Sequence, residues 1–289
     1  MGVRASVVCL VLLLGAGCSG SDSGETTTTV PESSTTTSTL GSADVAVPFD
    51  TSEPWDLVWF SDSTGWGVAD LWAERISEEF GVELRVHDHS SSVLPAVEVL
   101  RSLGFTRFGD ETHWFGRFGD LRDEISEAEI VVVYGNPIDS GSTEDLQQCV
   151  TTSTAPRDPP VHFSAGDFEP YPSVFESIFE QILALAGGRP IIVRAIDSYN
   201  PLIADQEAAG VKDECVRAWE AWSASIGRAA VAYGVSMVSM YDAFNGVDHI
   251  EDPRAQGYIT GDGQHATPEG QQVLATAMHQ AGYKTTTSP

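Results

Sequence analysis

The sequence predicts an α/β protein, a three-layer α/β/α sandwich around a five-stranded parallel sheet. Short apolar runs typical of buried strands alternate along the chain with longer segments whose apolar residues recur at helical spacing. Glycine stands after several of these longer segments, where it ends a helix. Strands that alternate with helices pair in parallel and are covered by helices on both faces.

The expected strands are short and rich in apolar residues, and they cover 56–61, 82–87, 129–134, 190–196 and 235–241. The expected helices are longer, and they cover 68–80, 94–103, 171–186, 213–233 and 267–281. Their ends carry local signals. Gly81 follows the first helix, and Thr267 precedes the last one as an N-cap, with Pro268 in its first turn.

The N-terminus predicts an export signal over 1–17. Arg4 gives it a positive start, and the apolar run 7–14 is too short to span a bilayer as a mature helix. The small residues 15–17 followed by Cys18 resemble a bacterial lipoprotein signal, in which this cysteine is lipidated. We therefore expect an extracytoplasmic protein. It is either lipid-anchored to the bacterial cell membrane through Cys18, its one membrane contact, or plainly secreted.

Three further segments follow the signal. Residues 18–44 are rich in Ser and Thr and predict a disordered tether with a mean reach of about 25 Å, because they offer too little apolar surface to offset their ordering entropy. Residues 45–283 show no break in composition and predict one large domain. The last residues, 284–289, are expected to be a disordered tail.

The charge balance bears on partners. The formal net charge is -27, from 42 acidic and 15 basic residues. A surface this acidic repels nucleic acid and anionic lipid head groups, so neither is an expected partner.

The cysteines agree with an oxidising compartment. Of the four, Cys9 leaves with the signal and Cys18 is the expected lipid site. We expect Cys149 and Cys215 to form a disulfide, which the chain-entropy model values at roughly 4 kcal/mol. Two cysteines without a nearby histidine pair make a poor zinc site.

The polar candidates for a site fall at the carboxyl ends of the expected strands, where sites form in parallel sheets. Ser63 follows the first strand, 90–92 the second, Asn136 the third and 197–201 the fourth. The loop 242–265 follows the fifth strand. Segments about two hundred residues apart are therefore expected to meet at one edge.

These residues suit nucleophilic catalysis. A serine hydroxyl needs a base, and His265 is the candidate base for Ser63. Asp262 is expected to accept a hydrogen bond from the other ring nitrogen of His265, which fixes the tautomer. The side chain of Asn136 and the backbone N–H of Ser63 are candidate donors to an oxyanion. No metal or organic cofactor is needed.

These segments resemble the SGNH hydrolases, or GDSL esterases and lipases, over most of 56–282. The motif Gly-Asp-Ser appears as Ser61-Asp62-Ser63, and Gly-x-Asn resembles Tyr134-Gly135-Asn136, where the glycine stands next to the asparagine and not two residues before it. The motif Asp-x-x-His is complete at 262–265. The resemblance implies a flavodoxin-like fold and a serine esterase acting through an acyl-enzyme. It assigns Ser63, His265 and Asp262 to acyl transfer and Asn136 to the oxyanion hole.

Two positions depart from the family pattern. Ser61 stands where the family has glycine. The oxyanion glycine expected after the second strand has no clear counterpart, and the backbone N–H of Ser91 or Ser92 is the expected substitute. A small acyl ester or carbohydrate ester is the expected substrate. The alternatives are a catalytically weakened glycan-binding lipoprotein of the same fold and a solute-binding lipoprotein.

Other polar and aromatic residues have simpler interpretations. His87 and His89 share one side of a strand and are expected to be satisfied at the sheet edge rather than by a metal. The acidic residues 248, 251 and 252 are expected to form a solvated loop. Trp66 and Tyr199 are expected to line a substrate pocket, whereas Trp114 could equally belong to the core.

Overall fold

The computed structural model describes residues 49–91, 94, 96–104, 121–135, 149 and 170–287. Residues Asp44–Pro289 form one compact unit. The expected signal, the lipid site Cys18 and the tether lie outside the described residues, as do Ser92, Trp114 and Asn136.

The centre of the described fold is a parallel sheet of five strands in the order β2-β1-β3-β4-β5. The strands are β1 (Trp55–Phe60), β2 (Leu84–Asp88), β3 (Ile130–Tyr134), β4 (Ile192–Ile196) and β5 (Ser236–Val238). All residues of β1, β3 and β4 except Asp56 and Arg194 are apolar, which fits strands covered on both faces. The predicted fold class is confirmed.

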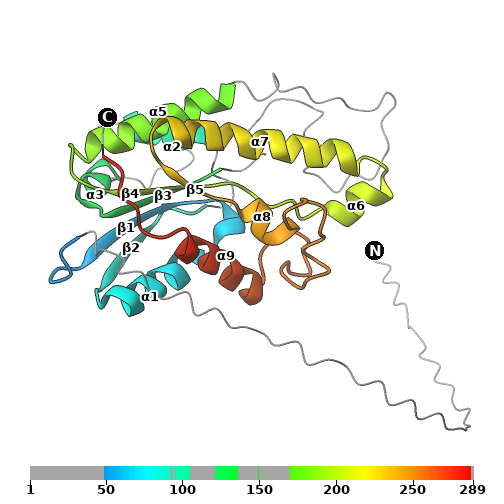
Figure 1. The fold of residues 1–289 in the computed structure, drawn as a ribbon, viewed down its shortest axis with the longest axis horizontal. Helices are drawn as coiled ribbons and strands as arrows, with labels where there is room; N and C mark the ends of the chain where they lie inside the picture. The colour runs from blue at the N-terminus through cyan, green and yellow to red at the C-terminus, as the bar shows by residue number, and fades with distance from the viewer. Residues whose placement is uncertain are drawn as a thin grey trace, which may run out of the picture. The chain divides into compact units, whose positions relative to one another are not determined.

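Helices cover both faces, as Figure 1 shows. One face carries α2 (Ala96–Gly104), α3 (Leu121–Glu127), α5 (Pro170–Leu185) and α7 (Lys212–Ala232), which bury Val58, Val131 and Val193 of the sheet. The other face carries α1 (Val68–Phe80), α8 (Met240–Asn245) and α9 (Pro268–Gln280), which bury Leu57 and Ile130. Neighbouring strand residues therefore point to opposite cores, as the pleat requires.

Four elements differ from the expectation. The expected fifth strand, 235–241, is shorter, because Ser239 caps a new helix by accepting a hydrogen bond from Asp242 N (2.9 Å). Met240 and Tyr241 therefore belong to α8, although their apolar character extends the strand pattern. The helices α3 and α6 (Ile203–Ala208) were not predicted, since each is too short for a clear helical repeat.

The strand order places the site. From β1 the chain adds β2 on one side of the sheet and β3, β4 and β5 on the other, so the strand order switches between β1 and β3. In doubly wound sheets ligands bind at this switch point. The turn with Ser63 follows β1, and Gly135 follows β3. A Cβ on Gly135 would lie 2.5 Å from Ile226 Cδ1 and 2.9 Å from the ring of Phe175, so any side chain there would have to displace these two core residues.

The end of the chain is joined to the sheet. Thr286 forms an antiparallel bridge with Ile191, and each backbone N–H donates to the other's carbonyl. Arg194, which is fully buried in β4, donates to the carbonyl oxygens of Gly282 and Lys284. Two residues of the expected disordered tail are thus bonded to the domain, Lys284 at Arg194 of β4 and Thr286 at Ile191 just before it.

The expected disulfide is present between Cys149 and Cys215, 66 residues apart, and it is buried beside Trp219 and Tyr241. It ties residue 149 to the first turns of α7.

None of the helices in the described part of the chain combines the length and apolar character needed to cross a membrane.

Candidate active site

The turn after β1 is built around Asp62. Residues Ser63–Gly65 form a single 3₁₀ turn, and Asp62 caps it by accepting from Thr64 N (2.8 Å) and Thr64 Oγ1 (2.6 Å). Thr64 Oγ1 also contacts Tyr134 Oη, which donates to Ser198 Oγ (3.1 Å). The turn that carries the candidate nucleophile Ser63, called the nucleophile turn below, is therefore tied by side chains to the ends of β3 and β4.

Ser61 fits at the position where the SGNH motif that it resembles has glycine. It is 1% exposed, and its hydroxyl lies 3.0 Å from the carbonyl oxygen of Asp62 and 2.7 Å from Ser90 Oγ. The room for it comes from Gly65, where a Cβ would lie 2.8 Å from both Cβ and Oγ of Ser61. The extra side chain of Ser61 is thus matched by the absence of one at residue 65.

The candidate base is oriented by a carboxylate. His265 Nδ1 lies 2.7 Å from Asp262 Oδ2, as the spacing predicts. The other oxygen of Asp262 accepts from Thr260 Oγ1 (2.6 Å) and from the backbone N–H groups of Gln264 (2.8 Å) and His265 (3.0 Å). These hydrogen bonds, that of Thr260 first, lower the pKa of Asp262, so it stays ionised beside the imidazole.

The loop that carries this pair is closed at its base. Ile259 and Ala266 form an antiparallel bridge, and Thr260 N donates to His265 O (2.8 Å). Gly263 has a φ of 81°, which a side chain would strain. The loop leads directly into α9, whose first turn is capped by Thr267 Oγ1 accepting from Gly270 N (3.1 Å). The imidazole thus projects from a short, internally bonded loop.

The two halves of the candidate site meet. Trp66, three residues after Ser63, stacks on the ring of His265 with centroids 5.6 Å apart and planes 5° apart. Gln271 Nε2 of α9 donates to Trp66 O (3.0 Å). Segments two hundred residues apart in sequence are therefore in contact, as their positions at one sheet edge predict. The role of Gln271 was not foreseen, since a helical glutamine gives no sequence signal.

Tyr199 supports the histidine loop from inside the protein. Its ring is 1% exposed and stacks on Phe244 with centroids 4.4 Å apart. Its hydroxyl donates to Gln264 O (2.6 Å), the carbonyl directly before His265. The expectation that Tyr199 lines a substrate pocket is therefore wrong, because the ring is covered and the hydroxyl is used in the loop. Trp66, in contrast, is 45% exposed.

Asp62 is the second carboxylate near His265. It is 5% exposed. Burial raises its pKa from 3.8 to about 6, although the hydrogen bonds from Thr64 and the charge of His265 lower it. The positive charge of a protonated His265 is therefore felt by two carboxylates, one on its own loop and one in the nucleophile turn.

The expected oxyanion donors have different outcomes. The backbone N–H of Ser91 donates to Ser61 O (3.1 Å), so it is already used and does not point to an oxyanion. Ser92 and Asn136 lie outside the described residues. The bond from Ser91 continues the pairing of β1 with β2 past the strand ends, which explains why this N–H is used internally.

The histidines of β2 pair with carboxylates. His87 Nε2 lies 2.9 Å from Asp56 Oδ1, and His89 Nε2 lies 2.6 Å from Glu124 Oε2. In the ranges that the structure describes, no group of three or more His, Cys, Asp or Glu side chains is arranged to hold a metal ion.

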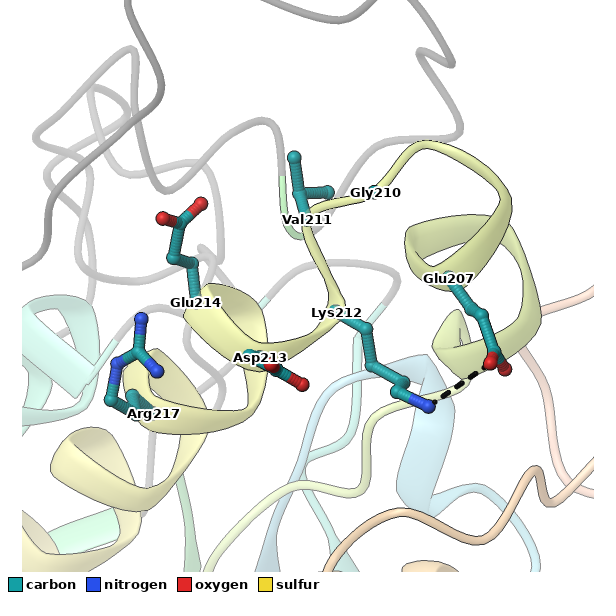
Figure 2. A pocket seen from close by; sticks show the side chains of 7 residues that line it. All are labelled: Glu207, Gly210, Val211, Lys212, Asp213, Glu214 and Arg217. Atoms are coloured by element: carbon teal, nitrogen blue, oxygen red, sulfur yellow. Dashed lines mark ion pairs between the residues drawn. The ribbon is translucent and has the colours of Figure 1, made fainter.

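A separate surface hollow lies where α6 leads into α7 (Figure 2). It is lined mainly by charged side chains, and Lys212 Nζ lies 3.2 Å from Glu207 Oε1. None of its lining residues belongs to the candidate site around His265.

Comparison with known proteins supports the fold. No protein-family model and no curated protein matches the chain. Among solved structures, a lipase from a goat rumen metagenome is 16% identical, with a TM-score of 0.56 over 79% of this chain and 98% of its own. TesA is 17% identical, with a TM-score of 0.50 over 78% and 97%. Phospholipase A1 from Streptomyces albidoflavus is 14% identical, with a TM-score of 0.50 over 79% and 100%.

These likenesses extend over nearly the whole length of the solved structures. At such low identity they show the fold, which is the one that the resemblance to SGNH hydrolases implied.

Proposed function

We propose that this chain is a serine ester hydrolase of the SGNH type, in which Ser63 is the nucleophile, His265 the base and Asp262 its orienting partner. The observation that carries the proposal is the pair of contacts at His265. One ring nitrogen faces Asp262 at 2.7 Å, and the ring stacks on Trp66 of the nucleophile turn. Such an imidazole is fixed in orientation and leaves Nε2 to face the substrate side.

The reaction follows from this arrangement. Ser63 Oγ attacks the ester carbonyl carbon while His265 Nε2 takes the hydroxyl proton. The tetrahedral intermediate collapses, the bond to the alcohol oxygen breaks, and that oxygen takes the proton from Nε2. A water molecule then gives a proton to Nε2 and attacks the acyl carbon; the bond to Ser63 Oγ breaks, Oγ takes that proton back from Nε2, and the acid is released. Asp262 stays ionised throughout and stabilises the imidazolium.

The oxyanion is expected to be held by the backbone N–H of Ser63 and the side chain of Asn136. Gly135, which is fixed by the donation of its N–H to Ile196 O (2.8 Å), delivers the chain to residue 136 at the end of β3. Removing one such donor costs about a hundredfold or more in kcat. Asn136→Ala should therefore lower kcat by that factor with a small change in KM.

The expected setting is extracytoplasmic. The disulfide between Cys149 and Cys215 and the N-terminal sequence support export, with Cys18 as the lipid site. The acidic surface disfavours anionic lipids and nucleic acid as partners, so a small acyl or carbohydrate ester is the proposed substrate. The solute-binding alternative is disfavoured because that class has two lobes, whereas the described strands form one sheet.

The nucleophile is tested by covalent labelling. A fluorophosphonate should react with Ser63 in the purified protein, and peptide mass spectrometry should locate the adduct there. Ser63→Ala should abolish both labelling and turnover of p-nitrophenyl acetate. Labelling at another serine, or unchanged turnover in Ser63→Ala, would contradict the proposal.

The base and its partner are tested by a matched pair of variants. Asp262→Asn keeps the shape of the side chain but removes its charge, and it should lower kcat by up to about ten-thousandfold. The control is Asp242→Asn, which alters another exposed pair of the same length, Asp242 Oδ1 and His249 Nε2 at 2.7 Å. The control should leave kcat within about twofold of the wild type. Equal effects of the two substitutions would remove Asp262 from the mechanism.

A further inference from the structure

Trp66 differs from the other described tryptophans in its exposure. The other five are buried in the cores: Trp55, Trp59, Trp72, Trp219 and Trp222. Trp66 is 45% exposed, yet one side of its ring system lies against His265. An indole that is left open to solvent beside a candidate catalytic imidazole contributes little to the core, so its position calls for another explanation.

The backbone of Trp66 is held in place from the far end of the chain. Gln271 Nε2 donates to Trp66 O at 3.0 Å. The next residue, Gly67, has a φ of 76°, and a Cβ there would lie 3.1 Å from Gln271 Nε2. The carboxamide of Gln271 therefore fills the space that a side chain at residue 67 would take. This fixes the indole relative to α9 and to the loop of His265 without burying it.

The geometry of ester cleavage says which part of a substrate meets this indole. Nδ1 of His265 is occupied by Asp262, so Nε2 must protonate the departing alcohol oxygen and lie within hydrogen-bond reach of it. The alcohol part of the ester therefore lies beside the imidazole, and the acyl chain lies on the other side of the carbonyl carbon. Because Trp66 stacks on that imidazole, its exposed surface borders the space for the alcohol.

The charges nearby constrain the alcohol further. Asp262 on its own loop faces His265, and Arg254 lies near Gly263 in the same loop. Arg254 is itself paired with Asp205 (2.9 Å). An anionic alcohol would be repelled by the exposed carboxylate of Asp262, whereas the flat apolar face of a neutral ring would pack on the indole.

We infer that Trp66 forms the alcohol subsite of this enzyme and that the preferred ester is one whose alcohol is a neutral ring, such as a sugar unit. This inference rests on the proposed hydrolase function and deepens it. Trp66 is a binding residue in this assignment. The chemical step itself is carried out by Ser63 and His265. His265 gives its Nε2 proton to the alcohol oxygen as the bond between that oxygen and the acyl carbon breaks.

The test varies the two sides of the ester separately. The alcohol series consists of ethyl acetate, cyclohexyl acetate and an O-acetylated methyl glucoside, and the acyl series of cyclohexyl acetate and cyclohexyl butyrate. Trp66→Leu should lower kcat/KM for the two ring acetates at least about tenfold more than for ethyl acetate, mainly through KM. Trp66→Phe should restore most of this loss. Cyclohexyl acetate and the acetylated sugar distinguish a general ring preference from a sugar preference.

The control is Val231→Ala, which removes exposed apolar surface on α7, on the opposite face of the sheet, and should change nothing. An equal loss for all three acetates would overturn the subsite, since the indole would then act only on the imidazole. A change in the acetate-to-butyrate ratio would also overturn it, because it would place Trp66 on the acyl side.

A binding measurement separates this inference from the proposed function. In Ser63→Ala, which cannot form an acyl-enzyme, the O-acetylated methyl glucoside should change the tryptophan fluorescence, and Trp66→Leu in that background should abolish the change. A wild-type protein that hydrolyses no ester and resists the fluorophosphonate contradicts the hydrolase function. If the wild-type protein hydrolyses esters but Ser63→Ala shows no fluorescence change, only the subsite is contradicted.

Discussion

The hydroxyl of Tyr199 donates a hydrogen bond of 2.6 Å to the carbonyl oxygen of Gln264, the residue before the candidate catalytic histidine. Tyr199 comes from the loop after β4, and Gln264 belongs to the loop before α9. The ring of Tyr199 is packed on Phe244 of α8. This hydrogen bond links the buried core around Tyr199 to the backbone next to His265 and helps to fix the position of the loop that carries the imidazole.

Tyr199→Phe tests that connection with a minimal change. The ring and its packing on Phe244 remain, but the bond to Gln264 is lost. We expect kcat for p-nitrophenyl acetate to fall roughly tenfold, because a loosened loop no longer fixes the imidazole. The free energy of unfolding should fall by about 1 kcal/mol.

Tyr258→Phe is the matched control, since Tyr258 also packs on Phe244, with ring centroids 5.3 Å apart. It should retain the wild-type kcat. Steady-state kinetics and urea unfolding of both variants provide the measurements. A Tyr199→Phe variant with full activity would show that the loop is held well enough by its own bridge between Ile259 and Ala266.

Gly65→Ala tests the fit between Ser61 and the nucleophile turn. The new methyl group would lie 2.8 Å from Cβ and Oγ of Ser61, so we expect a loss of about 1–3 kcal/mol in the free energy of unfolding. Ser61→Gly alone should cost about 1 kcal/mol through the lost hydrogen bond to Ser90 Oγ.

The two substitutions should not be additive. In the double variant the methyl group introduced at residue 65 takes the space vacated by the side chain of Ser61, so its loss should be smaller than the sum of the single losses by at least about 1 kcal/mol. Urea unfolding of the four proteins measures this coupling. Simple additivity would mean that the turn relaxes away from Ser61.

Asp197 predicts a pH dependence of stability that is separate from catalysis. It is fully buried, and burial raises its pKa to about 6, although Ser223, Ser239 and the backbone of α8 donate to it. Between about pH 4 and 6 the folded state then keeps a proton that the unfolded state has lost, so stability falls as the pH rises through this window. Above about pH 6 the ionised, buried Asp197 lowers the free energy of unfolding by its full amount, up to about 3 kcal/mol.

Asp197→Asn should remove this fall, because the two serine hydroxyls can turn to accept from the amide. The difference in unfolding free energy between the variant and the wild type, measured in urea from pH 4 to 7, should therefore change steadily in favour of the variant. Asp213→Asn, at an exposed position in the first turn of α7, is the control and should show no such trend. Parallel pH profiles for Asp197→Asn and wild type would refute the assignment.

The disulfide should be a major source of stability. It closes a loop of 66 residues, and replacing both Cys149 and Cys215 by Ser should lower the free energy of unfolding by up to about 4 kcal/mol. The candidate site should keep its activity in the folded variant, because neither cysteine contacts it. Thiol titration of the unfolded wild-type protein should find this pair only after reduction; free thiols before reduction would contradict the bond.

Local signals explain why much of this fold could be predicted. The bounds of α1 match the prediction because Gly67 and Gly81 flank a clear amphipathic repeat. The contact of Asp262 with His265 was also predictable, since it lies within one short loop. In contrast, Val235 to Tyr241 reads as one apolar strand, and only the cap formed by Ser239 reveals that it is divided between β5 and α8.

The sequence could not predict how residues that are far apart along the chain pack against each other. Tyr199 is an aromatic residue in a loop at the sheet edge, and such a position is compatible with either a pocket wall or a buried support. Its burial depends on Phe244 and on the carbonyl of Gln264, which lie 45 and 65 residues further along the chain. The accommodation of Ser61 by Gly65 likewise depends on packing and not on a motif.

The guanidinium of Arg194 gives the backbone of residues 282–284 a role inside the sheet. This cation is fully buried in β4, and its donors meet the carbonyl oxygens of Gly282 and Lys284. A buried cation without acceptors is costly, so these two backbone carbonyls take the place of water around the guanidinium. They act as a solvation shell that the chain itself supplies to the interior of the sheet.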